Sequence, residues 1–196
     1  METQVASVVR FAYFHLWRIA QLRPYLDRGG LTTLVHALII SRLDHCNALY
    51  VGLPLRLMQK LQMVQNAAAR LLSGVRKHQH ISPTLAALHW LPIRFHVDFK
   101  VLMITYKALN GLGPQYLADH LLPPRSTRIT QYNQQGRLRG LMPREARKEK
   151  TRNQAFSAVA PQLWNTLPTE IRLAPSLGVF KKLKTWLFRQ AFPPVS

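Results

Sequence analysis

Acidic residues are scarce in this chain. Eight Asp and Glu stand against 27 Lys and Arg among 196 residues, which gives a formal net charge of +19. The acids are dispersed, and no Asp-Asp or Asp-x-Asp pair occurs. Metal-assisted phosphoryl transfer needs carboxylates that converge on metal ions about 4 Å apart, so the sequence argues against this chemistry. The imbalance favours a polyanionic partner, because surface Lys and Arg attract phosphate backbones.

Cysteine and long apolar runs are also scarce. The single cysteine, Cys46, excludes an internal disulfide and favours an intracellular location, in the nucleus or the cytoplasm. The first residues lack the basic start and apolar core of a secretory signal peptide. Residues 5–26 are amphipathic and contain three arginines, which leaves mitochondrial import as an alternative. No apolar run approaches the roughly 20 residues of a transmembrane helix, so no membrane span is expected.

Apolar residues recur at helical spacing along most of the chain, and no stretch predicts a strand. The helices predicted in the first part of the chain cover residues 5–23, 31–43, 55–73, 83–88 and 93–109. Gly74 is the expected C-terminal cap of the third helix and Ser82 the expected N-cap of the fourth. Gln62 and Gln65 fall on the polar face of the third helix. The expected fold is an all-α helical bundle followed by a smaller helical unit.

Composition changes after residue 122. Residues 125–152 hold nine basic residues and two acids with little apolar periodicity, which predicts a linker or long loop. Beyond it, the pattern predicts a helix to Ala160, a proline-bounded turn around Trp164, and a closing helix capped by Ser176. The predicted organisation is a helical region at 1–76, a central helical region at 77–122, a basic linker at 123–152 and a C-terminal helical unit at 153–196.

Histidine and cysteine form no recognisable metal or catalytic motif. His78 and His80 are a close pair, but zinc sites draw on several Cys and His at recurring spacings. Asp44, His45 and Cys46 are adjacent, so on a helix they point in different directions, which disfavours a nucleophile with its base. Cys46 is therefore interpreted as a small buried residue. No metal, cofactor or catalytic residue is expected.

The basic residues carry the strongest functional signal. Arg can bind phosphate through two hydrogen bonds, and Tyr132 within the basic linker can stack on a base. The candidate nucleic-acid-binding residues are Lys60, Arg70, Arg76, Lys77, Arg125, Arg128, Arg137, Arg139, Arg144, Arg147, Lys148 and Arg152. A solvated linker is the alternative interpretation of residues 125–152, and an anionic membrane surface is the alternative polyanion. Because the positive excess runs through the whole chain, the pattern favours binding.

Several short stretches are similar to one protein family. They are SRLDHCN at 41–47, LQMVQNAAARL at 61–71, LHWLP at 88–92, YKALNG at 106–111, APQLWNTLP at 160–168 and the closing residues 180–188. Together they resemble, over nearly the whole chain, the region that follows the catalytic palm in reverse transcriptases of LINE-like, non-LTR retrotransposons. The resemblance implies that residues 1–76 correspond to the α-helical thumb, which grips the template and primer duplex, and that the rest corresponds to the C-terminal extension.

The resemblance also implies that catalysis is absent. The polymerase aspartates of that family lie in the palm, upstream of the region that this chain resembles. The expectation is a truncated fragment without polymerase activity, which agrees with the dispersed acids. The leading hypothesis is a non-catalytic fragment of a retrotransposon reverse transcriptase that binds RNA or an RNA-DNA hybrid without sequence preference.

Three alternatives stay open at the level of sequence. One is a helical protein-interaction module that exposes an apolar helix face to another chain. The second is a relic without selected activity, which departures from the family pattern favour: His45 stands where Tyr is usual, His96 where a basic residue is usual, and residues 129–133 where a serine-containing basic stretch is usual. The third is a residual nuclease that acts through the scattered acids.

Overall fold

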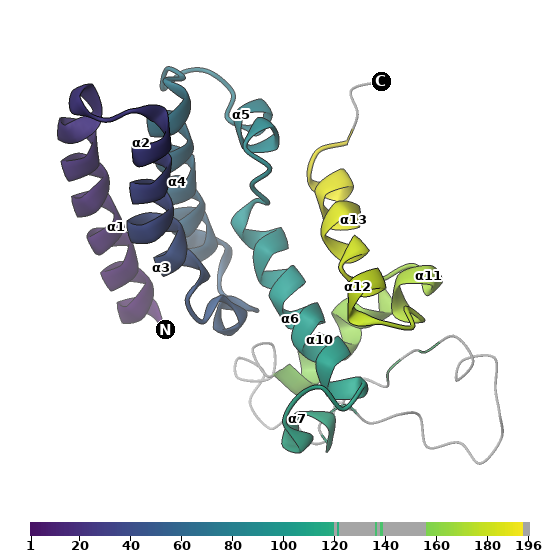
Figure 1. Ribbon diagram of the computed structural model, residues 1–196. Helices are drawn as coiled ribbons and strands as arrows, with labels where there is room; N and C mark the ends of the chain where they lie inside the picture. The colour runs from purple at the N-terminus through teal and green to yellow at the C-terminus, as the bar shows by residue number, and fades with distance from the viewer. Residues whose placement is uncertain (120, 122–135, 137, 139–155, 194–196) are drawn as a thin grey trace, which may run out of the picture. The chain divides into compact units, whose positions relative to one another are not determined.

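The structure is a computed structural model that describes residues 1–119, 121, 136, 138 and 156–193 (Figure 1). Every regular element among these residues is a helix, which confirms the predicted all-α fold. The chain groups into two compact units. The first comprises Met1–Asn47, Leu53–His96 and the residues from Ala191 onward, and the second comprises Ala48–Gly52 and Val97–Gln190. The four-segment division stays a prediction, because the expected linker lies almost entirely outside the described residues.

The first unit begins with α1 (Glu2–Leu22). Its buried face consists of Val5, Ala12, Leu16 and Ile19, which helical spacing places on one side. The helix gives way to the 3-10 turn η1 (Arg23–Tyr25). Pro24 causes this change, because it has no N–H to donate to the preceding helical turn. The predicted first helix and its end are confirmed.

The second helix changes its winding along its length. It consists of α2 (Arg28–Val35), the π-helical turn η2 (His36–Ile40) and α3 (Ser41–Asp44) in direct succession, and Asp27 is the N-cap of α2. The buried residues are Leu31, Val35, Ile39 and Leu43. In an α-helix each step of four residues drifts by about 40° around the axis. The wider π turn offsets part of this drift, so the buried stripe keeps facing its neighbours.

α4 (Leu55–Ser73) matches the predicted helix at both ends. Its buried residues are Leu57, Leu61, Val64, Gln65, Ala68 and Ala69. Gly74 ends the helix in the left-handed conformation at φ 71°, and its N–H donates to the carbonyl of Arg70 at 2.8 Å. Because glycine takes this φ without the strain of a Cβ, the predicted cap is confirmed.

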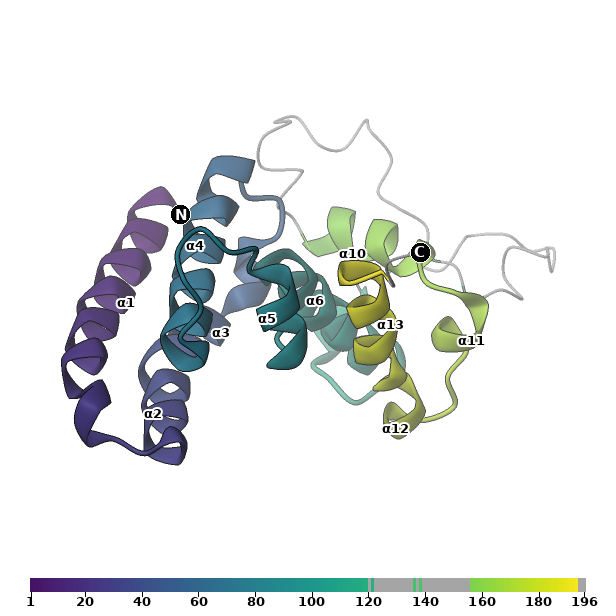
Figure 2. The same ribbon diagram turned by 90° about the horizontal axis from the view of Figure 1, so that it is seen from above.

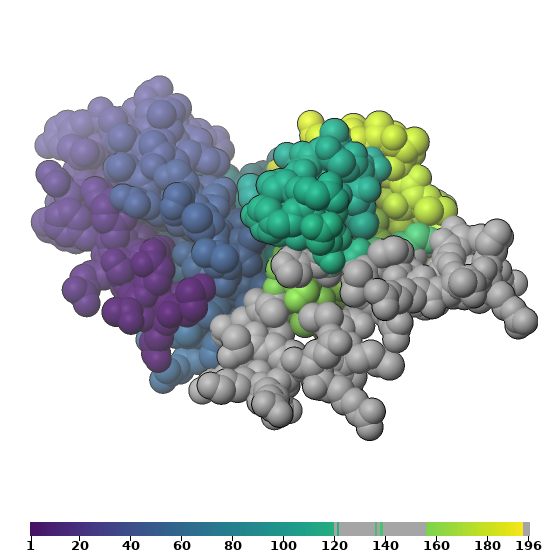
Figure 3. All heavy atoms as spheres, turned by 90° about the horizontal axis from the view of Figure 1, so that it is seen from below, coloured from purple at the N-terminus to yellow at the C-terminus, as the bar shows by residue number. Residues whose placement is uncertain are grey.

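α1 and α4 pack side by side and run in the same direction (Figure 2). At their N-terminal ends, Arg56 Nη2 donates to Glu2 Oε1 at 2.5 Å. At their C-terminal ends, a Cβ added to Gly74 would lie 3.1 Å from Arg23 Nη2. α2 packs against both helices, and side chains fill the space between the ribbons of this bundle (Figure 3). The parallel arrangement therefore joins the C-terminal ends of α1 and α4.

α5 (Ser82–Ala87) begins one residue earlier than predicted. Its N-cap is Ile81, whose carbonyl accepts the N–H of Leu85 at 3.0 Å. Ser82 as N-cap is therefore wrong, because the first helical hydrogen bond already forms at the carbonyl before it. α6 (Ile93–Leu109) follows as predicted and ends ahead of Gly111, which has φ 67°.

Two glutamines of α4 hold the connection between α5 and α6. Gln65 Nε2 donates to the carbonyl of Leu91 at 2.9 Å, and the N–H of Ile93 donates to Gln62 Oε1 at 2.8 Å. Gln65 is only 4% exposed, so its assignment to the polar face is wrong. Its burial is tolerated because its amide is hydrogen-bonded.

An aromatic stack lies in the core of the second unit. The rings of Tyr106 and Phe180 lie 4.2 Å apart, and the ring of Trp164 lies 5.7 Å from that of Phe180. The Tyr106 hydroxyl donates to the carbonyl of Ala174 at 3.0 Å. The remaining elements are η3 (Asn47–Tyr50), α7 (Gln115–Asp119), α10 (Phe156–Asn165), α11 (Thr169–Arg172), α12 (Leu177–Phe180) and α13 (Lys182–Ala191). The N-cap predicted at Ser176 is confirmed, since its Oγ accepts from the backbone of α12.

The turn predicted around Trp164 is wrong, because α10 continues through Pro161 to Asn165. Tertiary contacts hold this last helical turn in place. Trp164 Nε1 donates to the carbonyl of Gly136 at 2.8 Å. The Asn165 side chain bonds both backbone groups of Leu138, at 2.9 and 2.7 Å. These partners are distant in sequence, so local pattern could not reveal them.

Replacing Gly74 with Ala should lower the free energy of unfolding by about 1–2 kcal/mol, because a Cβ is strained in the left-handed conformation. Asn tolerates this conformation better, so Gly74→Asn should cost less. Urea denaturation followed by circular dichroism measures both changes. The matched control is Gly178→Ala, whose added Cβ would meet only Ser176 Oγ at 3.8 Å. An equal loss at Gly178 would contradict the left-handed cap.

Candidate nucleic-acid interface

Cations of the first unit gather where α1 and α4 end. Because the two helices are parallel, their C-terminal ends lie together, next to the start of α2 (Figure 1). The residues at this place, which we call the basic end, are Arg23, Tyr25, Arg28, Arg70, Arg76 and Lys77. They come from separate stretches of sequence that only the fold brings together.

The turn after α1 presents an aromatic ring beside arginines. Pro24 restricts the backbone within the 3-10 turn, and the N–H of Leu26 donates to the carbonyl of Arg23 at 3.4 Å. Tyr25 leaves this turn with 86% of its surface exposed. An exposed ring among cations suits nucleic acid, because a base can stack on the ring while phosphates pair with the cations.

The loop after α4 is folded on itself. The N–H of Arg76 donates to Gln79 Oε1 at 3.1 Å, and the N–H of Gln79 donates to the carbonyl of Arg76 at 3.1 Å. Arg70 Nη2 donates to the carbonyl of Gln79 at 3.3 Å, so the last turn of α4 holds the loop. The side chains of Arg76 and Lys77 are exposed. The loop therefore presents two cations on a hydrogen-bonded backbone.

The basic end keeps a positive net charge after the nearby negative charges are subtracted. It holds five cations, and the acid in the same stretches is Asp27, which caps α2 by accepting the N–H of Gly30 at 2.9 Å. The C-terminal ends of α1 and α4 contribute about half a negative charge each. Five cations minus one acid and these two half charges leave a net charge of roughly +3. This charge attracts phosphate.

The structure joins some of the predicted binding residues and separates others. Arg70, Arg76 and Lys77 belong to the basic end. Lys60 is exposed on α4 ten residues before Arg70, about 15 Å away along the helix axis, and so lies apart from this surface. The other predicted residues lie outside the described part of the chain: Arg125, Arg128, Arg137, Arg139, Arg144, Arg147, Lys148 and Arg152. The same holds for Tyr132.

Reasoning from the sequence missed Arg23, Tyr25 and Arg28. A signal for Arg23 was present, because a cation directly after a helix stabilises its C-terminal end. The periodic pattern carries no information on which helices run parallel. Only that arrangement places Arg23 beside Gly74 and so joins both stretches in one surface.

Cys46 is exposed, and its predicted burial is wrong. It follows α3 in a left-handed conformation at φ 54°, and this turn leaves its side chain at the surface. Asp44 Oδ1 lies 3.2 Å from His96 Nδ1, so this acid is directed toward α6. Within the ranges that the structure describes, no group of three or more His, Cys, Asp or Glu side chains is placed to hold a metal ion.

No helix among the described residues combines the length and the apolar character that a membrane crossing requires. Comparison with protein-family models, with curated proteins and with solved structures finds no match for the chain. The chemistry of the surface residues is therefore what bears on function.

Replacing Arg23 with Gln should lower the free energy of unfolding by about 0.5–1 kcal/mol, because a cation is lost from the joined helix ends. The loss should shrink at high salt, which screens exposed charges. Urea denaturation at low and high NaCl concentration measures it. Arg10→Gln is the matched control, since Arg10 is exposed in the middle of α1. An equal, salt-dependent loss at Arg10 would contradict the interaction with the helix ends.

Proposed function

We propose that this chain is a non-catalytic helical protein that binds RNA or an RNA-DNA hybrid through the phosphate backbone, without sequence preference. The observation that carries the proposal is the basic end, where five cations and an exposed tyrosine stand on the chain segments that adjoin the C-terminal ends of α1 and α4. Contacts to phosphate position a nucleic acid without reading its bases. The net charge of +19 adds a long-range attraction for polyanions.

The resemblance to reverse transcriptases of LINE-like retrotransposons supports the same function. In that family the thumb is an α-helical subdomain that grips a duplex, and the first unit is α-helical with a basic surface. Its acids have local roles: Glu2 pairs with Arg56, Asp27 caps α2, and Asp44 pairs with His96. On this proposal the chain binds the nucleic acid and catalyses no step, and it acts in the nucleus or the cytoplasm.

The double variant Arg76→Gln with Lys77→Gln should weaken binding of RNA-DNA hybrids of unrelated sequence to a similar extent. The slope of log K against log salt is negative, and each lost phosphate contact reduces its magnitude by about 0.9. The double variant should therefore reduce this magnitude by nearly 2. Fluorescence anisotropy of labelled hybrids, titrated with the full chain at several salt concentrations, measures both effects.

The control for this variant removes two exposed cations from other helices, Lys107→Gln with Arg189→Gln. Net charge falls by the same amount, but the basic end is intact. If both double variants lowered the slope equally, total charge and not the basic end would account for binding. If the unaltered chain bound no hybrid at low salt, or bound it with little salt dependence, the proposal would fail.

Tyr25→Ala should weaken binding of single-stranded RNA by roughly 5- to 150-fold, because stacking contributes about 1–3 kcal/mol per base. A fully paired hybrid has no free base face along its length, so its affinity should change little. Competition between the two labelled probes measures the difference. Tyr116→Ala is the control, since Tyr116 is 62% exposed on α7. Equal effects of the two substitutions would show that Tyr25 has no stacking role.

A further inference from the structure

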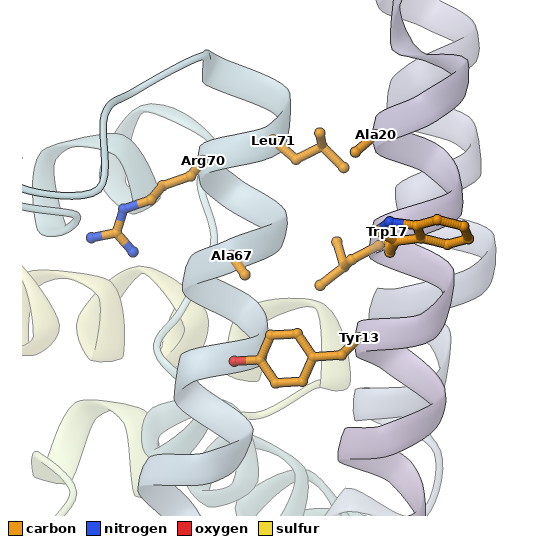
Figure 4. A pocket seen from close by; sticks show the side chains of 7 residues that line it. Tyr13, Trp17, Ala20, Ala67, Arg70 and Leu71 are labelled. Atoms are coloured by element: carbon orange, nitrogen blue, oxygen red, sulfur yellow. The ribbon is translucent and has the colours of Figure 1, made fainter.

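An apolar groove follows the seam between α1 and α4. It has a volume of about 430 Å³, and its lining includes Tyr13, Trp17, Ala20, Ala67 and Leu71. The ring of Tyr13 extends toward α4, whereas the side chain of Leu71 extends toward α1 (Figure 4). Arg70 lines the groove too, but its guanidinium points away from α1. No residue of α2 contributes to this lining, so α2 leaves this part of the seam open.

Large apolar side chains along the groove are exposed. Trp17 is 62% exposed, Tyr13 is 41% exposed, and Met63, one helical turn before Ala67, is 60% exposed. Neighbouring exposed apolar side chains of this size mark interaction surfaces. The small side chains of Ala20 and Ala67 leave room for a side chain from a facing helix, as in the packing of ridges into grooves. The shape of the groove suits an α-helix.

Cations stand at both ends of the groove. Arg10 precedes Tyr13 by three positions and Lys60 precedes Ala67 by seven, so helical spacing places both on the faces that form the groove. Both are exposed. At the other end, Arg23 lies beside Gly74. The distance from Arg10 to Arg23 corresponds to about 20 Å of helix, which a partner helix of about four turns spans.

Acids are almost absent from the two helices. α1 and α4 together contain five cations and one acid, Glu2, which pairs with Arg56 at 2.5 Å. A second copy of the chain would therefore meet its own positive charge, which opposes self-association through this groove. A partner with carboxylates flanking apolar residues would meet complementary charge at both ends.

We propose that the groove between α1 and α4 docks an acidic amphipathic α-helix of another protein. Its apolar residues, spaced at i, i+3, i+4 and i+7, insert beside Trp17 and Leu71. Its carboxylates pair with Arg10 and Lys60 at one end and with Arg23 at the other. This interaction shares Arg23 with the basic end, but it can be tested apart from nucleic-acid binding because Arg76 and Lys77 take no part in it.

The probe is a labelled peptide of about 15 residues, with Leu at the four apolar positions and Glu at most others. The control peptide carries Lys in place of every Glu. Fluorescence anisotropy with the full chain should show binding of the Glu peptide, and binding of the Lys peptide should be at least about tenfold weaker. Equal binding of the two peptides, or no binding of the Glu peptide, would overturn the proposal.

Two substitutions test the apolar part of the groove. Trp17→Ala removes the largest exposed side chain of the groove, and Ala67→Leu fills part of its space. Each substitution should lower the affinity for the Glu peptide by about tenfold or more. Tyr116→Ala, a substitution of an exposed aromatic residue on α7, should leave binding unchanged. Circular dichroism verifies that each variant is folded. One variant removes a side chain from the groove and the other adds one. If either variant is folded and binds the Glu peptide as the unaltered chain does, the proposal is contradicted.

Two further measurements separate this partner from other anions. Arg76→Gln with Lys77→Gln should bind the Glu peptide as the unaltered chain does, even if nucleic-acid binding is lost or was never present. Vesicles of phosphatidylcholine and phosphatidylserine test a membrane surface as the occupant. Binding to vesicles that depends on Trp17, without binding of the Glu peptide, would assign the groove to a membrane and overturn the proposal.

Discussion

The parallel packing of α1 along α4 is the constraint on which the described surfaces of the first unit depend. Parallel helices place like ends of their dipoles together, which is unfavourable unless opposite charges stand there. Glu2 stands at the joined N-terminal ends and Arg23 at the joined C-terminal ends. Exposed ion pairs contribute less than about 1 kcal/mol, whereas each fully buried Leu or Val contributes about 1.5–3 kcal/mol. Apolar burial therefore holds the helices together, and the charges favour the parallel direction.

The parallel packing also explains why one small bundle has both a basic surface and an apolar groove. At the joined C-terminal ends, the turn after α1 and the loop after α4 supply cations and an exposed ring from opposite sides of the seam. Along the seam, Ala20 and Ala67 are too small to fill the space between the helices, so Tyr13 and Trp17 line an open groove. Arg23 belongs to both surfaces. Its position beside Gly74 places the basic end next to the apolar groove.

The sequence was sufficient where a helix determines its own limits. The apolar stripe of α4 and the glycine after it predicted both helix ends, because these signals are local. Gln65 and Trp164 mark where such reasoning stops. The amide of Gln65 is buried because the carbonyl of Leu91 lies against it, and the turn at Trp164 is helical because Gly136 and Leu138 bond to it. Only part of the basic end could be predicted for the same reason. Its cations are visible in the sequence, but the relative direction of α1 and α4, which brings the two stretches together, is not.

The two units also differ in when their partners are synthesised. The hydroxyl of Tyr106 and the carbonyl of Ala174 are separated by 68 positions, whereas Glu2 and Arg56, which are paired across α1 and α4, are separated by 54. Long separations raise the entropy cost of closure and slow folding. During synthesis, α1, α2 and α4 can pack as soon as Gly74 has left the ribosome, but the partners of the Tyr106 side chain, the Ala174 carbonyl and the Phe180 ring, emerge about 100 residues later. The basic end is therefore formed on the nascent chain before the aromatic stack exists.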